Sequence, residues 1–337
     1  MNKKYTFDDV MLEATFSKVQ SRKSCSTDSY LFGANVEVPI MNANMDTVVN
    51  TSVANGIHSA GGLSALHRFM PVGDNITAFQ QSPNAWVSVG LKENDIERID
   101  ALLNAGARKF IIDTAHGANQ YVIDTLDYIK QKSFNSKVMV GNFGSPNSLA
   151  MFLDNCNYYT PDAVKLGVGS GSNCATSVVT GVGYPQLSLI MDSVKIAKQN
   201  NVVIVSDGGA KTIGDVCKAL AAGADFVMTG SLFAGAKDAP GTTENGYKVY
   251  RGSASKESYE TQGKTAEHRT PEGIARKVKE KDETAFDIVK HIQAGIKSSM
   301  SYLNATTLDE YRIRASFVEV THHGYIQGTP HGLRENQ

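Results

Sequence analysis

Eight short apolar runs, spread along the first two thirds of the chain, constrain its fold more than any other feature of the sequence. Most of these runs are rich in valine and isoleucine and are too short for helices, which is typical of buried parallel strands. They cover residues 36–41, 62–66, 85–90, 109–113, 137–141, 162–167, 202–206 and 225–229. Each run follows the previous one after about one strand–helix unit. Eight such units predict an α/β protein with a (β/α)8 TIM barrel, although strand counting alone leaves a doubly wound open sheet as an alternative.

Helical patterns lie between these runs. In residues 95–106 the apolar side chains recur at steps of three and four, and Gly106 supplies a stop signal. The tripeptide Ala-Gly-Ala occurs at 105–107 and again at 222–224, just before two of the runs. At both places we expect a helix to end and to turn directly into a strand.

Two parts of the chain do not fit the repeat. Residues 1–35 precede the first run, and we expect this extension to cover the bottom or an edge of the barrel. Residues 236–285 follow the eighth run and are rich in Lys, Glu, Gly, Ser and Thr. A polar insertion of this length is typical of a mobile functional loop, so we expect an active-site flap here. Apolar periodicity returns at 285–296, the predicted eighth helix, and no second boundary divides the single domain of 1–337.

Composition excludes several classes of partner. The 337 residues include 33 Lys and Arg against 34 Asp and Glu, a formal net charge of −1. This balance does not favour binding to nucleic acid or to an anionic membrane. No stretch is long and apolar enough for a membrane helix, and the amino terminus lacks the apolar region of a secretion signal. The four cysteines have no paired spacing. We therefore expect a soluble, reduced, cytoplasmic protein.

The loop after the sixth run carries the first candidate for chemistry. Residues 167–176 read Gly-Val-Gly-Ser-Gly-Ser-Asn-Cys-Ala-Thr, so glycines that let the backbone approach a ligand precede Cys174. A lone cysteine is more often incidental, but its place after a strand and a glycine-rich turn favours a nucleophile. Cys156 and Cys217 are interpreted as packing residues, and Cys25 lies outside the barrel.

Loops after other runs add polar groups at the same end of the barrel. Asp207 followed by two glycines suits vicinal ribose hydroxyls and a phosphate, and Gly230-Ser231 follows the eighth run. Loops after strands seven and eight are common phosphate sites in such barrels. Asp113 and Asn142 close the fourth and fifth runs and should face the barrel mouth. His116 is either an acid or base or merely a helix cap.

Taken together and in this order, the motifs identify a resemblance. The 167–176 loop, residues 180–186 (Thr-Gly-Val-Gly-Tyr-Pro-Gln), Ser206-Asp-Gly-Gly209 and Gly230-Ser231 resemble the IMP dehydrogenase / GMP reductase family over nearly the whole chain. The resemblance implies a (β/α)8 barrel, typically a homotetramer, in which a cysteine bonds to C2 of a purine nucleotide. A reductase releases ammonia from GMP and reduces the adduct to IMP with NADPH. A dehydrogenase oxidises IMP with NAD and hydrolyses the adduct to XMP.

Several features favour the reductase branch. Most dehydrogenases insert regulatory domains between early barrel units, but the second and third runs leave no gap for them. Residues 42–47 and 180–186 look like reductase segments. The Arg-Tyr pair that activates water in dehydrogenases is absent from the sequence, and Tyr259-Glu260 occupies the corresponding region. We therefore expect a GMP reductase. A short IMP dehydrogenase and a non-catalytic purine-nucleotide-binding barrel are the alternatives.

The resemblance also implies individual roles. Cys174 is the expected nucleophile, with Thr176 and Glu272 as the proton-transfer pair. The expected substrate contacts are Ser172, Asp207, Gly209, Gly230, Ser231, Tyr250, Gly252, Ser253, Ala254, Arg269 and Gly273. The expected cofactor contacts are Asp113, Asn142 and Lys165. The carbonyls of Gly169, Gly171 and Cys174 match a potassium site. Two positions depart from the family pattern, because Ser253 replaces a common Met and Ala175 a usual Thr.

Overall fold

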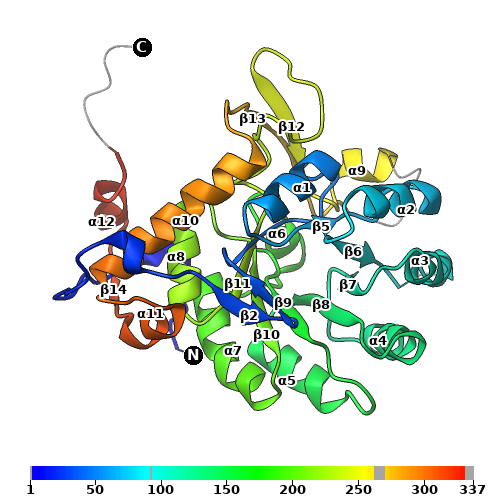
Figure 1. Ribbon diagram of the computed structural model, residues 1–337, viewed down its shortest axis with the longest axis horizontal. Helices are drawn as coiled ribbons and strands as arrows, with labels where there is room; N and C mark the ends of the chain where they lie inside the picture. Colours follow the sequence, from blue (N-terminus) through cyan, green and yellow to red (C-terminus); the bar gives the residue numbers. More distant parts are fainter. Residues whose placement is uncertain (1, 92, 262–269, 331–337) are drawn as a thin grey trace.

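The computed structural model describes residues 2–91, 93–261 and 270–330, and eight parallel strands form its centre (Figure 1). Their order in the sheet is β4-β11-β10-β9-β8-β7-β6-β5. A parallel bridge between Met41 and Leu63 brings the two ends of this sheet together. The closed arrangement confirms the predicted (β/α)8 barrel, and the open doubly wound alternative is wrong. The strands are β4 (Ile40–Asn42), β5 (Ala65–Leu66), β6 (Trp86–Val89), β7 (Lys109–Asp113), β8 (Lys137–Phe143), β9 (Ala163–Leu166), β10 (Val203–Asp207) and β11 (Phe226–Thr229).

Each predicted run overlaps one of these strands, but the first two runs begin too early. β4 begins only at Ile40, because Val36 pairs within a separate hairpin and Pro39 has no N–H to donate. β5 is reduced to two residues after the positive φ of Gly61. The other six strands begin and end within two residues of the predicted runs.

Helices follow the strands and surround the barrel (Figure 1). The predicted helix at 95–106 is α3 (Glu93–Asn104), and Gly106, with φ +97°, ends the turn that follows it. The predicted eighth helix continues to Tyr302, and the side chain of Thr284 caps its first turn. The other helices are α1 (Thr51–Ser59), α2 (Val72–Gln81), α4 (Gln120–Lys132), α5 (Pro146–Asp154), α6 (Thr176–Thr180), α7 (Gln186–Gln199), α8 (Ile213–Ala221), α9 (Lys256–Thr261), α10 (Ala285–Tyr302), α11 (Leu308–Arg314) and α12 (His322–Gln327).

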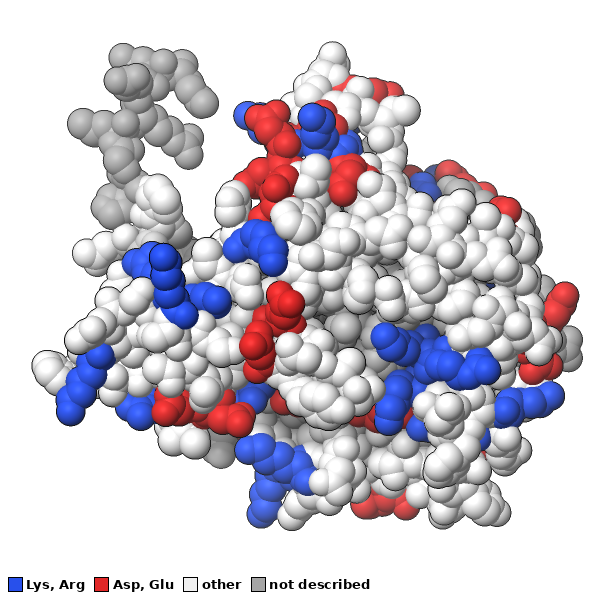
Figure 2. Space-filling model, viewed as in Figure 1, with Lys and Arg blue, Asp and Glu red and all other residues white. Residues whose placement is uncertain are grey.

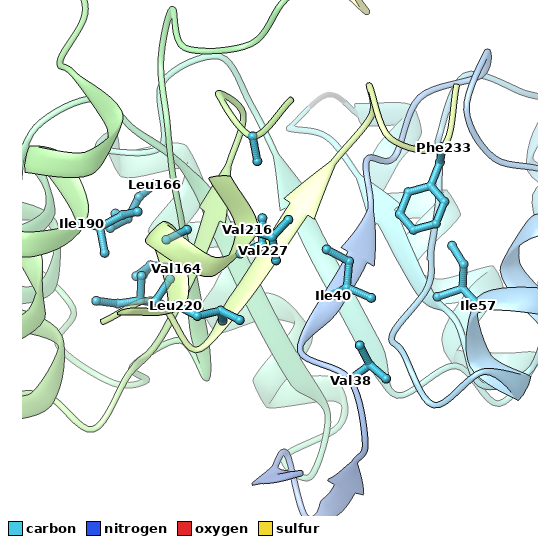
Figure 3. Close-up of a cluster of buried hydrophobic side chains, with 14 of the residues drawn as sticks. Val38, Ile40, Ile57, Val164, Leu166, Ile190, Val216, Leu220, Val227 and Phe233 are labelled. Carbon is cyan, nitrogen blue, oxygen red and sulfur yellow. The ribbon is translucent and has the colours of Figure 1, made fainter. Parts of the chain in front are cut away.

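Successive side chains of each barrel strand point alternately outward and inward, and this divides the core into two layers. Figure 3 shows the outer layer, in which Val164 and Leu166 of β9 lie near Ile190 of α7, and Val227 of β11 lies near Val216 and Leu220 of α8. The neighbouring strand residues point inward and fill the barrel. This inner cluster comprises Val36, Met41, Ala43, Ala65, Trp86, Ile111, Met139, Ala163, Val205, Phe226 and Met228. The barrel is therefore packed solid, and open space is left only beyond the strand ends.

Part of the amino-terminal extension closes the bottom of the barrel. The hairpin of β2 (Ser29–Leu31) and β3 (Ala34–Val36) carries Phe32 at its turn. The Phe32 ring lies 4.8 Å from the Trp86 ring and 5.9 Å from the Phe226 ring, measured between centroids. Trp86 and Phe226 begin their strands, so this contact lies at the end opposite the candidate loops. Before the hairpin come η1 (Phe7–Asp9), β1 (Val10–Leu12) and η2 (Arg22–Ser24), and β1 pairs with β14 (Phe317–Glu319) near the other end of the chain.

The described residues between 236 and 285 include a separate two-stranded sheet. The antiparallel strands β12 (Tyr247–Arg251) and β13 (Ala275–Lys279) lie side by side at one end of the molecule (Figure 1), and α9 follows β12. The division into one domain with an extension and a mobile flap stays a prediction.

Basic and acidic groups occur in small separate clusters on the face shown in Figure 2. Within the described ranges, no helix is both long and apolar enough to cross a membrane.

Candidate active site

Cys174 lies on the loop between β9 and α6, at the carboxyl end of the barrel strands. Its side chain is exposed, and its Sγ lies 3.2 Å from Thr176 Oγ1. The loop depends on glycine at Gly169, which has φ +78° and where a Cβ atom would lie only 1.8 Å from Ser177 Oγ. The Cys174 N–H donates to the Gly171 carbonyl at 2.9 Å and fixes the turn. The predicted nucleophile is therefore accessible and touches one of its two predicted proton-transfer partners.

The segment just before β13 brings Glu272 to the same place through backbone hydrogen bonds. The Ala175 N–H donates to the Glu272 carbonyl at 2.7 Å, and the Ile274 N–H donates to the Asn173 carbonyl at 3.0 Å. Between these bonds Gly273 pairs directly with Cys174. We call this pairing of residues 173–175 with 272–274 the backbone clamp. It places the three predicted catalytic residues around one cavity of about 530 Å³.

Four predicted site residues form a charged network in the wall of that cavity. Lys165 Nζ lies 2.8 Å from Asp113 Oδ1 and 3.1 Å from Asp207 Oδ2, and Asn142 Nδ2 donates to the same Asp207 oxygen at 2.9 Å. The Lys165 side chain is only 1% exposed. Burial alone would lower the pKa of Lys165, but Asp113 and Asp207 outweigh it and raise that pKa. Burial likewise opposes ionisation of Asp113, yet the charges of Lys165 and Arg68 hold its pKa below the usual value. Lys165 and Asp113 are therefore both charged at neutral pH.

A second cavity, of about 650 Å³, adjoins the first and contains the predicted phosphate loops. Ser172, Gly209, Gly230 and Ser231 line it, from the loops after β9, β10 and β11. Tyr250 lines both cavities and stands over Gly230, where a Cβ atom would lie 2.5 Å from its hydroxyl oxygen. Burial raises the pKa of Tyr250, so its phenol stays protonated at neutral pH.

The remaining predicted contacts fall in three groups. Gly252, Ser253, Ala254 and Gly273 line the first cavity. Arg269 lies outside the described residues. His116 has an exposed side chain and lines neither cavity, and Asn119 caps the following helix instead, so neither expectation for His116 is supported.

Sequence reasoning missed several residues that line the cavities. Asn44 and Arg68 line the first cavity, and Lys211 and Arg276 line the second. Asn44 and Arg68 follow the two strands whose runs were weakest, β4 and β5, which hid their place at the barrel mouth. Lys211 follows the Asp-Gly-Gly motif directly, and that position was the available signal for it.

The cysteine loop also offers oxygen donors. No group of three or more His, Cys, Asp or Glu side chains is arranged for a metal ion in the described part of the chain. Among these residues, the carbonyls of Gly169 and Cys174 accept no backbone hydrogen bond, whereas the Gly171 carbonyl accepts one. Backbone carbonyls are donors that suit a potassium ion. The three predicted carbonyls therefore fit a monovalent cation by donor type.

Comparison with known proteins agrees with this geometry. A model of the IMP dehydrogenase / GMP reductase domain matches residues 4–331. The chain belongs to this family. Members of the family are oxidoreductases of purine metabolism that use a nicotinamide cofactor.

Individual relatives carry both family names. An inosine-5'-monophosphate dehydrogenase of Nitrosopumilus maritimus is 39% identical over 265 residues, which cover 74% of this chain and 55% of that protein. One of Cryptosporidium parvum is 28% identical over 391 residues, covering 99% and 96%. This chain spans about half the length of most of the curated relatives it matches. A GMP reductase of Trypanosoma brucei, solved with guanosine 5'-monophosphate, superimposes with a TM-score of 0.90 at 23% identity over 99% of this chain and 98% of that one. This likeness shows the shared fold.

Proposed function

We propose that the protein is a GMP reductase, which converts GMP to IMP and ammonia with NADPH through a covalent bond between Cys174 and C2 of the purine. The observation that carries this proposal is the backbone clamp, which holds Glu272 beside Cys174 and Thr176. The sequence contains no Arg-Tyr pair with which to activate water against the adduct. A site with a proton donor and without that pair suits loss of ammonia better than hydrolysis.

The proposed reaction has two stages. The Cys174 sulfur bonds to C2 of GMP, and the bond from C2 to the 2-amino nitrogen breaks. Because an amide ion is a very poor leaving group, that nitrogen must be protonated before it departs as ammonia. In this proposal Thr176 and Glu272 deliver the proton, a contribution of about 10²- to 10⁴-fold. Bound NADPH supplies the hydride that C2 then accepts, and the bond from C2 to sulfur breaks to regenerate the Cys174 thiolate and release IMP.

The two cavities suit the two ends of the substrate. In this proposal Asp207 holds the ribose, and the backbone and hydroxyl groups of Ser172, Gly209, Gly230, Ser231 and Tyr250 hold the phosphate. Gly252, Ser253, Ala254 and Gly273 surround the base, with Arg269 as a further contact. Asp113, Asn142 and Lys165 would contact the nicotinamide cofactor when it binds. A potassium ion on the carbonyls of Gly169, Gly171 and Cys174 would stiffen the cysteine loop. The family resemblance further implies a homotetramer, which sedimentation velocity would test.

One observation favours a second candidate. Similar curated proteins are named IMP dehydrogenases, so oxidation of IMP with NAD is the alternative. A barrel that binds purine nucleotides without turnover is less consistent with Cys174, Thr176 and Glu272 lining a single cavity.

A paired assay distinguishes these functions. The purified protein is supplied with GMP and NADPH or NADH, and separately with IMP and NAD or NADP. We expect NADPH to be oxidised with GMP and an equal amount of ammonia to form. Reduction of NAD in the presence of IMP would replace the proposal with the dehydrogenase. Nucleotide binding without any redox change would leave only the binding protein.

A further inference from the structure

Lys248 is a buried cation that the proposed chemistry does not use. Its side chain is 3% exposed, and its Nζ donates to the carbonyls of Ala236, Lys237 and Ala239 at 2.9, 3.0 and 2.9 Å. An ammonium group has three protons, so these three carbonyls satisfy all of them. Glu280 Oε1, at 3.3 Å, supplies the opposite charge. We call these four acceptors the ammonium cage.

The three carbonyls of the ammonium cage belong to the loop that begins at the predicted phosphate site. Gly230 and Ser231 start the segment after β11, and Ala236, Lys237 and Ala239 follow in the same segment. Lys248 lies on β12, in which alternate residues point inward, so Tyr250 faces the same side as Lys248. Tyr250 stands over Gly230. Two neighbouring inward side chains of β12 thus contact the two ends of one loop.

Beyond Tyr250, the end of β12 contacts the cysteine loop and the loop that follows β4. Asn173 Nδ2 donates to the Tyr250 carbonyl at 3.1 Å, and the Arg251 guanidinium lies 2.5 Å from Asp46 Oδ2. Gly252 lies so close to the Asn173 carbonyl that a Cβ atom there would be 2.8 Å from it. How closely β12 packs against the loop after β11 therefore determines the positions of Tyr250 and of residues 252–254.

We propose that Lys248 is a positioning residue that fixes β12 against the β11 loop, so that Tyr250 and residues 252–254 are in place before the nucleotide binds. The activity measurements below rest on the proposed function, whereas the hydrogen-exchange measurement does not. A long buried cation suits this task because its three hydrogen bonds to carbonyls are charge-assisted and directional.

The test compares Lys248→Ala, Lys248→Met and the control Lys277→Ala. Lys277 is exposed on β13, opposite Val249, so its loss leaves the ammonium cage intact. Amide hydrogen exchange is followed in peptides covering 247–256 in the full chain without nucleotide. For both Lys248 variants we expect exchange in these peptides to accelerate at least about tenfold, as for the loss of one hydrogen bond to a charged group, with the barrel strands unchanged. Wild-type exchange in both variants would overturn the proposal.

Chemical rescue separates positioning from general damage. We expect Lys248→Ala to raise the KM for GMP more than it lowers kcat. The substitution removes the atoms of n-propylammonium, so adding that cation should restore slow exchange and should lower the KM again. Lys248→Met keeps the stem volume without the charge and should not respond. Equal responses of the two variants, or no response of Lys248→Ala, would contradict the ammonium cage.

Two further outcomes are decisive. If neither Lys248 variant folds, Lys248 supports the whole barrel and the positioning role is wrong. If the wild-type protein turns over neither GMP nor IMP while exchange in 247–256 still depends on Lys248, the proposed function fails and the positioning role stands.

Discussion

At the scale of single residues, accessibility separates Cys174 from the other three cysteines. Cys174 is exposed beside Thr176, whereas Cys25 and Cys217 are buried. Burial raises the pKa of both Cys156 and Cys217 to about 11, so these thiols stay protonated at neutral pH. Cys174 is exposed and lines the first cavity, so it is the cysteine that is accessible for the proposed bond to C2.

Replacing this sulfur should separate binding from chemistry. We expect Cys174→Ser to abolish turnover of GMP while its affinity for GMP, measured by calorimetry, stays within about threefold, because in the proposed binding mode the polar contacts come from the ribose and phosphate loops. Cys156→Ser is the matched control and should keep full activity. Full activity in Cys174→Ser would remove the covalent mechanism.

Glu272 should affect one stage of the reaction more than the other. We expect Glu272→Gln to slow ammonia release in a single turnover by about 10²- to 10⁴-fold, because the departing nitrogen loses its proton source. Hydride transfer to the preformed adduct should slow much less. Rapid-quench measurement of ammonia and of NADPH oxidation distinguishes the two stages. Glu260→Gln, an exposed carboxylate on the same flap, is the control. Unchanged ammonia release in Glu272→Gln would assign the acid to another group.

Lys165 should contribute stability that depends on pH. The folded-state pKa of Asp113 is lowered, so its stabilising contribution is present above its unfolded pKa of about 3.9 and is lost as pH falls through the folded value. The pKa of Lys165 is raised, so its contribution is present below about 10.4 and is lost only at higher pH.

Lys165→Met should therefore lower the free energy of unfolding by about 3–5 kcal/mol at neutral pH, because it leaves two carboxylates without their cation. The loss should shrink as the pH falls below about 4. Urea titrations across this range measure it, and a difference that stays constant down to pH 3 would contradict the linkage. Lys137→Met, which removes a half-exposed partner of Asp162, should cost less than about 1 kcal/mol.

At the scale of elements, the β2–β3 hairpin and the β12–β13 sheet occupy opposite ends of the same barrel. The inner layer ends at the bottom with Trp86 and Phe226, whose rings the Phe32 ring contacts. The candidate chemistry lies beyond the other ends of the strands. Stability and catalysis are therefore expected to respond separately to changes at the two ends.

Phe32→Ala tests this separation. Because Phe32 is half-buried, we expect a loss of about 2 kcal/mol in the free energy of unfolding, less than the 3–5 kcal/mol of a fully buried phenylalanine. The value of kcat/KM should stay within about twofold, since no cavity residue moves. Tyr30→Ala, at a position 76% exposed on the same hairpin, should cost less than about 0.5 kcal/mol. A fall in kcat/KM with unchanged stability would show the two ends to be coupled.

For the molecule as a whole, the sequence predicted what is repeated along the chain and missed what depends on contact between distant segments. Valine-rich runs and their spacing were enough for six strands and for the barrel. Asp113, Asn142, Lys165 and Asp207 were each predicted, but as separate ribose and cofactor contacts. The parallel pairing of β7, β8, β9 and β10 brings the ends of these strands, which are distant in sequence, close enough for one lysine to contact two aspartates. The ammonium cage likewise has no signal in sequence, because three of its four acceptors are main-chain carbonyls.

The backbone clamp has a consequence for how such enzymes diverge. Its hydrogen bonds join main-chain atoms of residues 173–175 to those of 272–274, so they do not depend on the side chains that the flap displays. Mutations elsewhere in the flap are therefore expected to alter what reaches the cavity while the main chains at Cys174 and Glu272 stay paired. One inherited scaffold could in this way give rise to catalysts that add water and to others that keep it out.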